Sequence, residues 1–286
     1  MPTCGFGFLK GSIDTGRPWE VASFLVMPRC DGTAQDYLAN LLFNKRKVER
    51  VGLLHPCLSQ TIDGICHLHR HNIAHRDLKE ANILFRQTPK PNGGVDITFM
   101  LADFGGARDL HNPAPFDLDT LTVYGTPGYW PPEMFAKNAV GMKYGRGLLG
   151  DIWSLFCIFW RQMKGGKDPK RGVGLPRGSR VTVEAAKKLF GIPEDFNEGD
   201  DKDFALIDGL LGRRMNLEPA DKKVAKKKQG YSRRDIYLYG VLYEYVKLVT
   251  KGLSYEPGGR PDAEACKAGL AGCNNLLQNW MHSYES

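Results

Sequence analysis

Apolar residues along the chain recur mostly at the spacing of one helix face. The run from 152 to 160 is apolar except for Ser154 and is far shorter than the roughly 20 residues that a membrane span requires, so it predicts a buried core helix. Thr33 and Asp262 lie where they would cap a helix. The pattern predicts helices over residues 33–43, 148–163, 183–190, 203–211, 238–253 and from 261 to about 280, and one that contains Leu58, Ile62, Ile65 and Leu68.

Shorter apolar runs predict strands in the first hundred residues. The segment 6–30 is β-rich, and its last apolar run ends at Pro28, which cannot donate to a sheet. Residues 83–85 and 95–101 flank a turn-forming stretch and predict a β-hairpin. Residues 105–132 have no helical period and many Gly, Pro and Asp residues, which is typical of a long functional loop.

Composition bounds the class of protein. The 286 residues, of which 42% are hydrophobic and 25% charged, suffice for one large domain or two small ones with a real core. Seven cysteines are scattered without a Cys-x-x-Cys pair, which indicates unpaired thiols in a reducing compartment. Residues 1–10 lack the basic start and apolar run of a signal peptide. We therefore expect a cytoplasmic or nuclear location and no membrane contact.

Much of the net charge of +7 lies in one stretch. Such a charge run is typical of a solvated loop, and we expect the long basic segment 165–234 to be a partly disordered insertion. A nuclear-import signal or a nucleic-acid patch is the alternative, although nucleic acid is not an expected partner. The basic residues are Lys222, Lys223, Lys226, Lys227, Lys228, Arg233 and Arg234.

Side chains suited to phosphate chemistry lie in the middle of the chain. Residues 75–82 have the sequence His-Arg-Asp-Leu-Lys-Glu-Ala-Asn, and Asp103 opens an Asp-Phe-Gly sequence 21 residues after Asn82. An Asp that accepts a hydroxyl proton, with an Asn and a second Asp that hold a metal ion, is the grouping used for phosphoryl transfer. Four nearby histidines do not share one helix face and predict no metal site: His67, His69, His71 and His75.

Five motifs occur in order along the chain, at residues 75–82, 103–105, 125–133 (Gly-Thr-Pro-Gly-Tyr-Trp-Pro-Pro-Glu), 151–154 (Asp-Ile-Trp-Ser) and 259–261 (Gly-Arg-Pro). Together they resemble the eukaryotic protein kinase family, mostly its serine/threonine branch, over about residues 21–270. The resemblance implies an α+β, protein kinase-like fold. In that fold, residues 1–30 would be a remnant of the β-rich N-lobe with the hinge, and residues 31–286 a mainly helical C-lobe.

The resemblance also implies roles for the motif residues. Asp77 matches the catalytic base, and Lys79 matches the lysine that contacts the transferred phosphate. Asn82 and Asp103 match the ligands of Mg²⁺, which prefers hard oxygen donors. Thr126 matches a threonine that hydrogen-bonds both the catalytic Asp and the Lys.

ATP is the cofactor that this resemblance implies. Residues 25–30 resemble the last N-lobe strand and the hinge, which puts Met27 at the gatekeeper position. Adenine would pair with the carbonyl of Pro28 and the backbone N–H of Cys30, and Leu84 would form the floor beneath it.

Other matches are structural or regulatory. Glu133 and Arg260 match a buried ion pair, and Asp151 matches a helix residue that hydrogen-bonds the backbone of the catalytic loop. Arg76 implies activation by phosphorylation, because an Arg there pairs with a phosphate added to the loop from Gly105 to Pro132. An activating kinase would then be a partner, and the candidate phosphosites are Thr120 and Thr122.

The residues before the hinge leave two functions open. They contain no glycine-rich loop and no Val-Ala-x-Lys-like strand; residues 5–7 are only a Gly-x-Gly fragment, and Lys10 is the only lysine. A lysine with a glutamate partner belongs to the transfer machinery. One function is a serine/threonine kinase that moves the γ-phosphate of ATP to a protein substrate. The alternative is a catalytically impaired kinase-like module that binds or regulates a partner.

Overall fold

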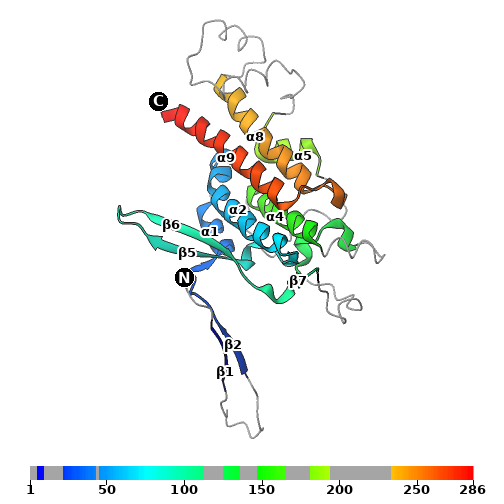
Figure 1. Ribbon diagram of the computed structural model, residues 1–286. Helices are drawn as coiled ribbons and strands as arrows, with labels where there is room; N and C mark the ends of the chain where they lie inside the picture. The colour runs from blue at the N-terminus through cyan, green and yellow to red at the C-terminus, as the bar shows by residue number, and fades with distance from the viewer. Residues whose placement is uncertain are drawn as a thin grey trace.

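The computed structural model describes residues 5–9, 22–42, 45–111, 125–135, 147–164, 181–193 and 233–285. A body of helices carries two β-hairpins that extend from it (Figure 1). The helices are α1 (Ala34–Leu41), α2 (Lys47–Arg70), α4 (Leu148–Lys164), α5 (Val183–Phe190), α8 (Arg233–Gly252) and α9 (Ala263–Glu285).

Helix α4 forms the centre of this body. It packs against α2, α5 and α8, while α9 lies across α2 and α8 (Figure 1). Its residues are buried almost without interruption, from Gly150 to Trp160. The prediction of a buried core helix is therefore confirmed, because a helix that is apolar on all sides needs partners on all sides.

The predicted caps of two helices are present. The Thr33 hydroxyl accepts a hydrogen bond from the N–H of Asp36 (3.3 Å) at the start of α1. The Asp262 carboxylate accepts one from the N–H of Ala265 (2.8 Å) at the start of α9. Each cap satisfies a backbone donor that has no partner within its helix.

The predicted hairpin in the middle of the chain is confirmed as β5 (Ile83–Pro89) and β6 (Val95–Leu101). Strand β5 is longer than predicted and also pairs with β3 (Gly32–Thr33). Two short strands, β4 (Ile73–Ala74) and β7 (Arg108–Asp109), pair with each other. The β-rich start of the chain forms a second antiparallel hairpin of β1 (Gly5–Leu9) and β2 (Ala22–Val26).

A side chain of α2 covers the outer edge of the β5–β6 hairpin. Gln60 donates to the carbonyl of Ile97 (3.1 Å) and accepts from the N–H of Phe99 (2.8 Å). On the inner face, the ring of Tyr37 lies 4.9 Å from that of Phe85. An edge strand needs partners for its backbone groups, so these contacts hold the hairpin in place against the helices.

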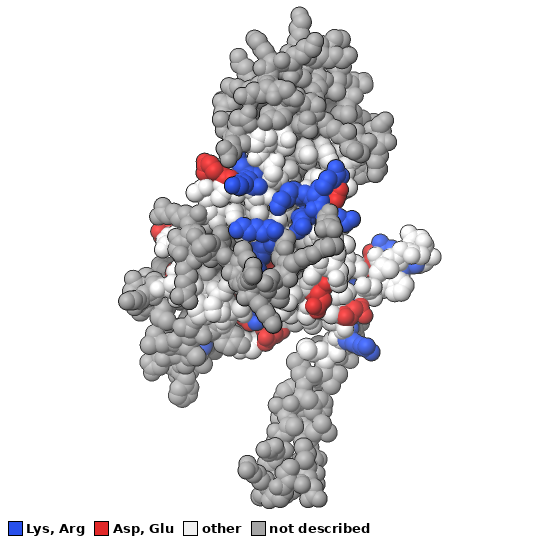
Figure 2. All heavy atoms as spheres, turned by 180° about the vertical axis from the view of Figure 1, so that it is seen from behind, with Lys and Arg blue, Asp and Glu red and all other residues white. Residues whose placement is uncertain are grey.

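Lys and Arg side chains gather on the face opposite to that of Figure 1 (Figure 2). Two basic residues at the start of α2 are partnered with the last turn of α4. Lys47 donates to the carbonyl of Met163 (2.8 Å), and Arg50 donates to that of Gln162 (3.1 Å). These cations satisfy carbonyls that lack partners within the helix, at the negative end of its dipole.

Several sequence-based expectations lie outside the described residues: the helix over 203–211, Lys10, Thr120, Thr122 and the basic residues before Arg233. None of the described helices is long and apolar enough to cross a membrane.

Candidate active site

Asp151, in the first turn of α4, holds the catalytic loop, residues 75–82. One carboxylate oxygen accepts the N–H of His75 (2.8 Å), and the other accepts the N–H of Arg76 (2.9 Å). His69 contacts the same carboxylate through Nε2 (3.1 Å). Arg76 has a left-handed φ of 73°, a conformation that a side chain disfavours and that these hydrogen bonds maintain. The core helix thus sets the path of the loop.

His75 links this loop to the Asp-Phe-Gly turn. The N–H of Asp77 points to His75 Nδ1 (3.3 Å), and Nε2 of the same ring lies 3.0 Å from the carbonyl of Ala102. An acceptor role for Nδ1 places the proton on Nε2, which then donates to Ala102. The imidazole therefore ties the residue before Asp103 to the loop that carries Asp77.

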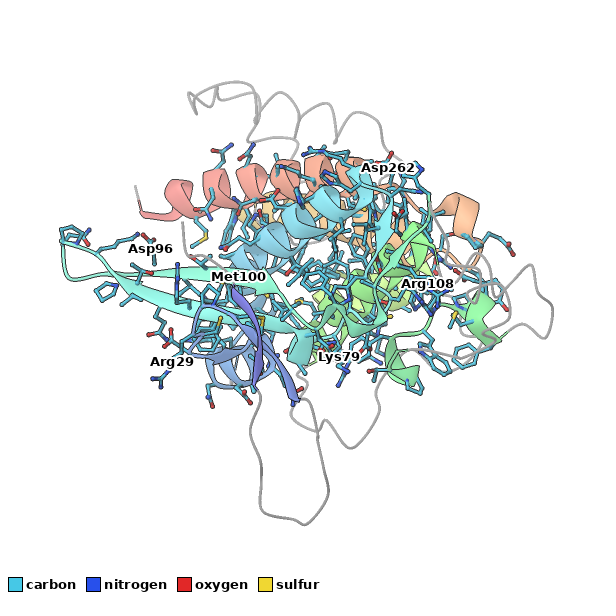
Figure 3. The ribbon with its side chains drawn as sticks, turned by 60° about the horizontal axis from the view of Figure 1, so that its bottom comes forward. Arg29, Lys79, Asp96, Met100, Arg108 and Asp262 are labelled. Atoms are coloured by element: carbon cyan, nitrogen blue, oxygen red, sulfur yellow. The ribbon has the colours of Figure 1, made fainter. Side chains whose placement is uncertain are left out.

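Asp77, Lys79 and Thr126 form a closed triangle of hydrogen bonds. Lys79 Nζ donates to Asp77 Oδ2 (2.8 Å) and to Thr126 Oγ1 (2.9 Å), and the Thr126 hydroxyl donates to Asp77 Oδ1 (2.8 Å). Two groups, one from the same loop and one from a distant segment, thus fix the orientation of the Asp77 carboxylate. Figure 3 shows Lys79 on the side of the helical body from which the β1–β2 hairpin extends.

Gly125 permits the position of Thr126. Its φ of +97° lies in a region that L side chains rarely adopt, and an added Cβ would lie 2.6 Å from the carbonyl oxygen of Arg76. Only glycine allows the two backbones to approach this closely. The approach brings Thr126 to Asp77, 49 positions earlier in the chain.

Asn82 and Asp103 lie at the same end of the β5–β6 hairpin. The carbonyl of Asn82 accepts the N–H of Ala102 (2.9 Å), next to Asp103. The Asn82 amide nitrogen donates to the carbonyl of Asp77 (2.9 Å) and to its Oδ2 (3.1 Å), so the amide oxygen is directed elsewhere. The exposed Asp103 carboxylate accepts a long hydrogen bond from the N–H of Gly105 (3.4 Å). Two residues with hard oxygen donors thus lie at neighbouring positions of the backbone, and such donors suit Mg²⁺.

The residues expected to hold adenine lie just after β2 and on β5. Met27, Pro28 and Cys30 form the extended stretch after β2, and the side chain of Met27 is 59% exposed. The Cys30 thiol lies 3.7 Å from the carbonyl of Pro28, the acceptor that adenine would use. Leu84 follows on β5, beside β3.

Strand register adds Met100 to this group, which sequence reasoning missed. Leu84 and Met100 are cross-strand partners, and both are half-buried, whereas the next pair, Phe85 and Phe99, is buried against the helices. Successive side chains of a strand point to opposite faces, so Leu84 and Met100 share the face away from the helices. Period-two alternation could have identified Met100 once the register was known.

Glu80 is a second residue that sequence reasoning missed. It lies in the short turn η1 (Glu80–Asn82), its side chain is 2% exposed, and burial raises its pKa. Its carboxylate accepts hydrogen bonds from Tyr129 and from Gln162 Nε2 (2.8 Å), and Arg161 lies 3.8 Å away. Residue spacing along the sequence does not predict that an acid is buried or that it has three polar partners, so no sequence signal identified Glu80.

The segment after Thr126 is tied to the last helices. Arg260, just before α9, donates to both carboxylate oxygens of Glu133 (2.6 Å each). Its guanidinium also lies 5.0 Å from the ring centre of Trp153 on α4. The two residues matched to a buried ion pair do form one.

Comparisons with known proteins agree with this geometry. Residues 17–268 match the model of the protein kinase domain. Among curated proteins, 108 residues are 34% identical to the serine/threonine-protein kinase PLK4 of Drosophila virilis, and 137 residues are 33% identical to the serine/threonine-protein kinase Nek3 of Mus musculus. A stretch of 105 residues is 34% identical to the serine/threonine-protein kinase cds1 of Schizosaccharomyces pombe.

These alignments cover 38%, 48% and 37% of this chain, and 12%, 23% and 20% of the respective relatives. The matched part is therefore a fraction of each relative, whereas the domain model spans most of this chain. The three relatives are serine/threonine-protein kinases, the branch of the family that the motifs of this chain resemble. The chain belongs to the protein kinase family.

Proposed function

We propose that this chain catalyses transfer of the γ-phosphate of ATP to a serine or threonine hydroxyl of a protein substrate. The triangle of Asp77, Lys79 and Thr126 carries the proposal, because it orients one carboxylate for the incoming hydroxyl. Enzymes of this kind act mainly by positioning and by charge stabilisation, which is the kind of arrangement this cluster supplies.

In the proposed reaction, the substrate hydroxyl oxygen forms a bond to the γ-phosphorus while the bond from that phosphorus to the bridging oxygen of ADP breaks. Asp77 accepts the hydroxyl proton. Lys79 neutralises negative charge on the transferred phosphoryl oxygens, and Thr126 keeps Asp77 and Lys79 in their relative positions.

Asn82 and Asp103 would hold Mg²⁺, which neutralises phosphate charge when it is bound. Support comes from the amide of Asn82, whose nitrogen is held by Asp77, and from the exposed carboxylate of Asp103 at the same end of the hairpin. Pro28 and Cys30 would bind adenine through their backbones, with Met27 at its edge. Leu84, with Met100, would lie beneath the ring.

A catalytically impaired, kinase-like binding module is the second candidate. The observation in its favour concerns the two described strands before the hinge. Their sequences, Gly-Phe-Gly-Phe-Leu in β1 and Ala-Ser-Phe-Leu-Val in β2, supply neither a lysine for the phosphates nor its glutamate partner. Such a module would bind or regulate a partner without transferring phosphate.

Partners and location follow from the proposed activity. A protein substrate is inherent to it, and an activating kinase would act on the loop from Gly105 to Pro132, where Arg76 would pair with the added phosphate. A cytoplasmic or nuclear location fits these partners. We also propose the division into a hinge-containing remnant, residues 1–30, and a C-lobe, residues 31–286.

Phosphate transfer by the purified chain decides between the two candidates. We expect Mg²⁺-ATP at millimolar concentration to raise the melting temperature, because a ligand stabilises the state that binds it. Radiolabel should pass from ATP to a generic protein acceptor, and Asp77→Asn should lower kcat about 100-fold or more while leaving the ATP-induced shift. Asp63→Asn, in an exposed ion pair with Lys267, is the matched control and should leave both unchanged. Nucleotide binding without transfer would favour the binding module.

A further inference from the structure

We propose that Glu80 is a positioning residue that joins the catalytic loop to the 125–130 segment and to the core helix α4. The inference rests on the proposed function, since that segment lies beside Asp77 and Lys79, where a protein substrate would be held. None of the roles implied for the catalytic loop uses Glu80.

Glu80 sits at the centre of a buried polar cluster. One carboxylate oxygen accepts from the Tyr129 hydroxyl, which itself accepts from Arg161 Nη1, and the other accepts from Gln162 Nε2 (2.8 Å). The guanidinium of Arg161 also stacks on the Tyr129 ring, 4.8 Å from its centre. Each carboxylate oxygen of Glu80 thus has a hydrogen-bond donor.

The cluster connects three segments. Glu80 follows Lys79 directly in the catalytic loop, and Tyr129 ends the short turn η4 (Pro127–Tyr129), three residues after Thr126. Arg161 and Gln162 lie near the end of α4. Ser154, about two turns earlier on α4, donates to the carbonyl of Tyr129 (2.9 Å). The 125–130 segment is therefore held to α4 through both the backbone and the side chain of Tyr129.

Helix α4 then supports the active site at two levels. Asp151 holds the backbone of the loop at His75 and Arg76, and Arg161, ten residues later, reaches the same loop at Glu80. Ten residues of helix span about 15 Å, so a rigid element fixes both ends of the loop. Such support keeps Asp77 and Thr126 at a constant separation.

A purely stabilising role does not require this chemistry. Well-packed apolar side chains often stabilise a core as well as a buried ion pair does, because two charges lose their water on burial. Burial, and to a smaller extent the charge of Glu80, raises the pKa of the Cys57 and Cys157 thiols on α2 and α4, so Glu80 lies close to the apolar core. Directional hydrogen bonds, by contrast, define one geometry for Tyr129 relative to Lys79.

Two variants test the inference. Glu80→Gln keeps the shape and removes the charge, and Tyr129→Phe removes only the hydroxyl that bridges Glu80 and Arg161. We expect each variant to raise the KM for a peptide substrate about 5- to 10-fold with the KM for ATP changed less than 2-fold, as loss of one buried hydrogen bond allows. Hydrogen–deuterium exchange should quicken in residues 125–135. Asp63→Asn is the control for a charge-neutralising change elsewhere.

The result that overturns the inference is a folded Tyr129→Phe variant with unchanged peptide KM and unchanged exchange in residues 125–135. Faster exchange spread evenly over the helices would also overturn it, because that pattern indicates a stabilising role alone. If Glu80→Gln does not fold, Tyr129→Phe decides. If the wild-type chain transfers no phosphate, the proposed function fails, and exchange in residues 125–135 still decides whether Glu80 holds that segment.

Discussion

Glu133 and Arg260 lie 127 positions apart in the chain and form a two-pronged ion pair, with both N–O distances at 2.6 Å. The guanidinium group is fully buried, and the backbone carbonyl of Ser254 accepts from its Nε at 3.0 Å. The pair therefore joins the segment after Thr126 to the start of α9 in a buried part of the structure.

We predict that Glu133→Gln lowers the free energy of unfolding by about 3–5 kcal/mol, because Arg260 would remain buried without its counter-charge. Urea denaturation measures the loss. The exposed pair of Arg70 and Glu264 is the control, since Glu264→Gln should cost about 0–1 kcal/mol. Equal losses from the two variants would contradict the prediction.

Replacement of Asp151 by Asn should loosen the catalytic loop. The amide nitrogen of Asn would face a backbone N–H at His75 or Arg76, so one buried donor would lose its acceptor, at a cost of about 1–3 kcal/mol. We expect kcat to fall about 10- to 100-fold as Asp77 moves. Asp96→Asn, in an exposed pair on the β5–β6 hairpin, should change neither quantity. Full activity of Asp151→Asn would show that the loop holds its shape without α4.

Gly125→Ala should separate Thr126 from Asp77. A Cβ at this position meets the Arg76 carbonyl at 2.6 Å, and the positive φ adds strain of about 1–3 kcal/mol. We expect kcat to drop about 10-fold or more while nucleotide still raises the melting temperature. Gly128→Ala is the matched control three residues later, because a Cβ there meets nothing within 4 Å. A similar drop in both variants would argue against the close approach of the two backbones as the cause.

Alkylation at pH 8 should distinguish the cysteines of the described part of the chain. Burial raises the pKa of Cys57, Cys266 and Cys273 to about 12 and that of Cys66 to about 11. A pKa raised from 9.0 to about 12 lowers the thiolate fraction roughly 1,000-fold, and the thiolate is the species that reacts. Cys30, half-buried in the stretch after β2, should react first with iodoacetamide.

Mass spectrometry of timed samples measures the order of alkylation. Because these pKa values lie above the working pH, a rise from pH 7 to pH 9 should leave the thiols of Cys57, Cys66, Cys266 and Cys273 largely protected in the folded chain. In 8 M urea the differences should disappear. Rapid labelling of Cys57 in the native protein would contradict the packing of α2.

Much of the secondary structure was predictable because its causes are local. The helical period placed α5 at its observed bounds and α4 within one residue, and Thr33 and Asp262 cap the helices they precede. The turn-rich stretch between β5 and β6 likewise predicted a hairpin. Each of these features depends on residues a few positions apart, where propensity and capping act directly.

The motif residues were also available from the sequence, and the tertiary structure decided how they meet. Asp77 and Thr126 are 49 positions apart, and their contact depends on a backbone approach that only Gly125 permits. The partnership of Leu84 with Met100 depends on strand register. The burial of Glu80 depends on Tyr129 and on two residues of α4.

The sequence by itself determined most of the described helices, the central hairpin and the residues that match the protein kinase motifs, because local spacing and motif order carry that information. Only the tertiary structure decided that Glu80 becomes part of the core and that Asp151 and Arg161 support one loop from two levels of α4. Packing sets such contacts: a side chain's burial and charge partners are decided by elements far away in the chain, which meet only once the core has formed.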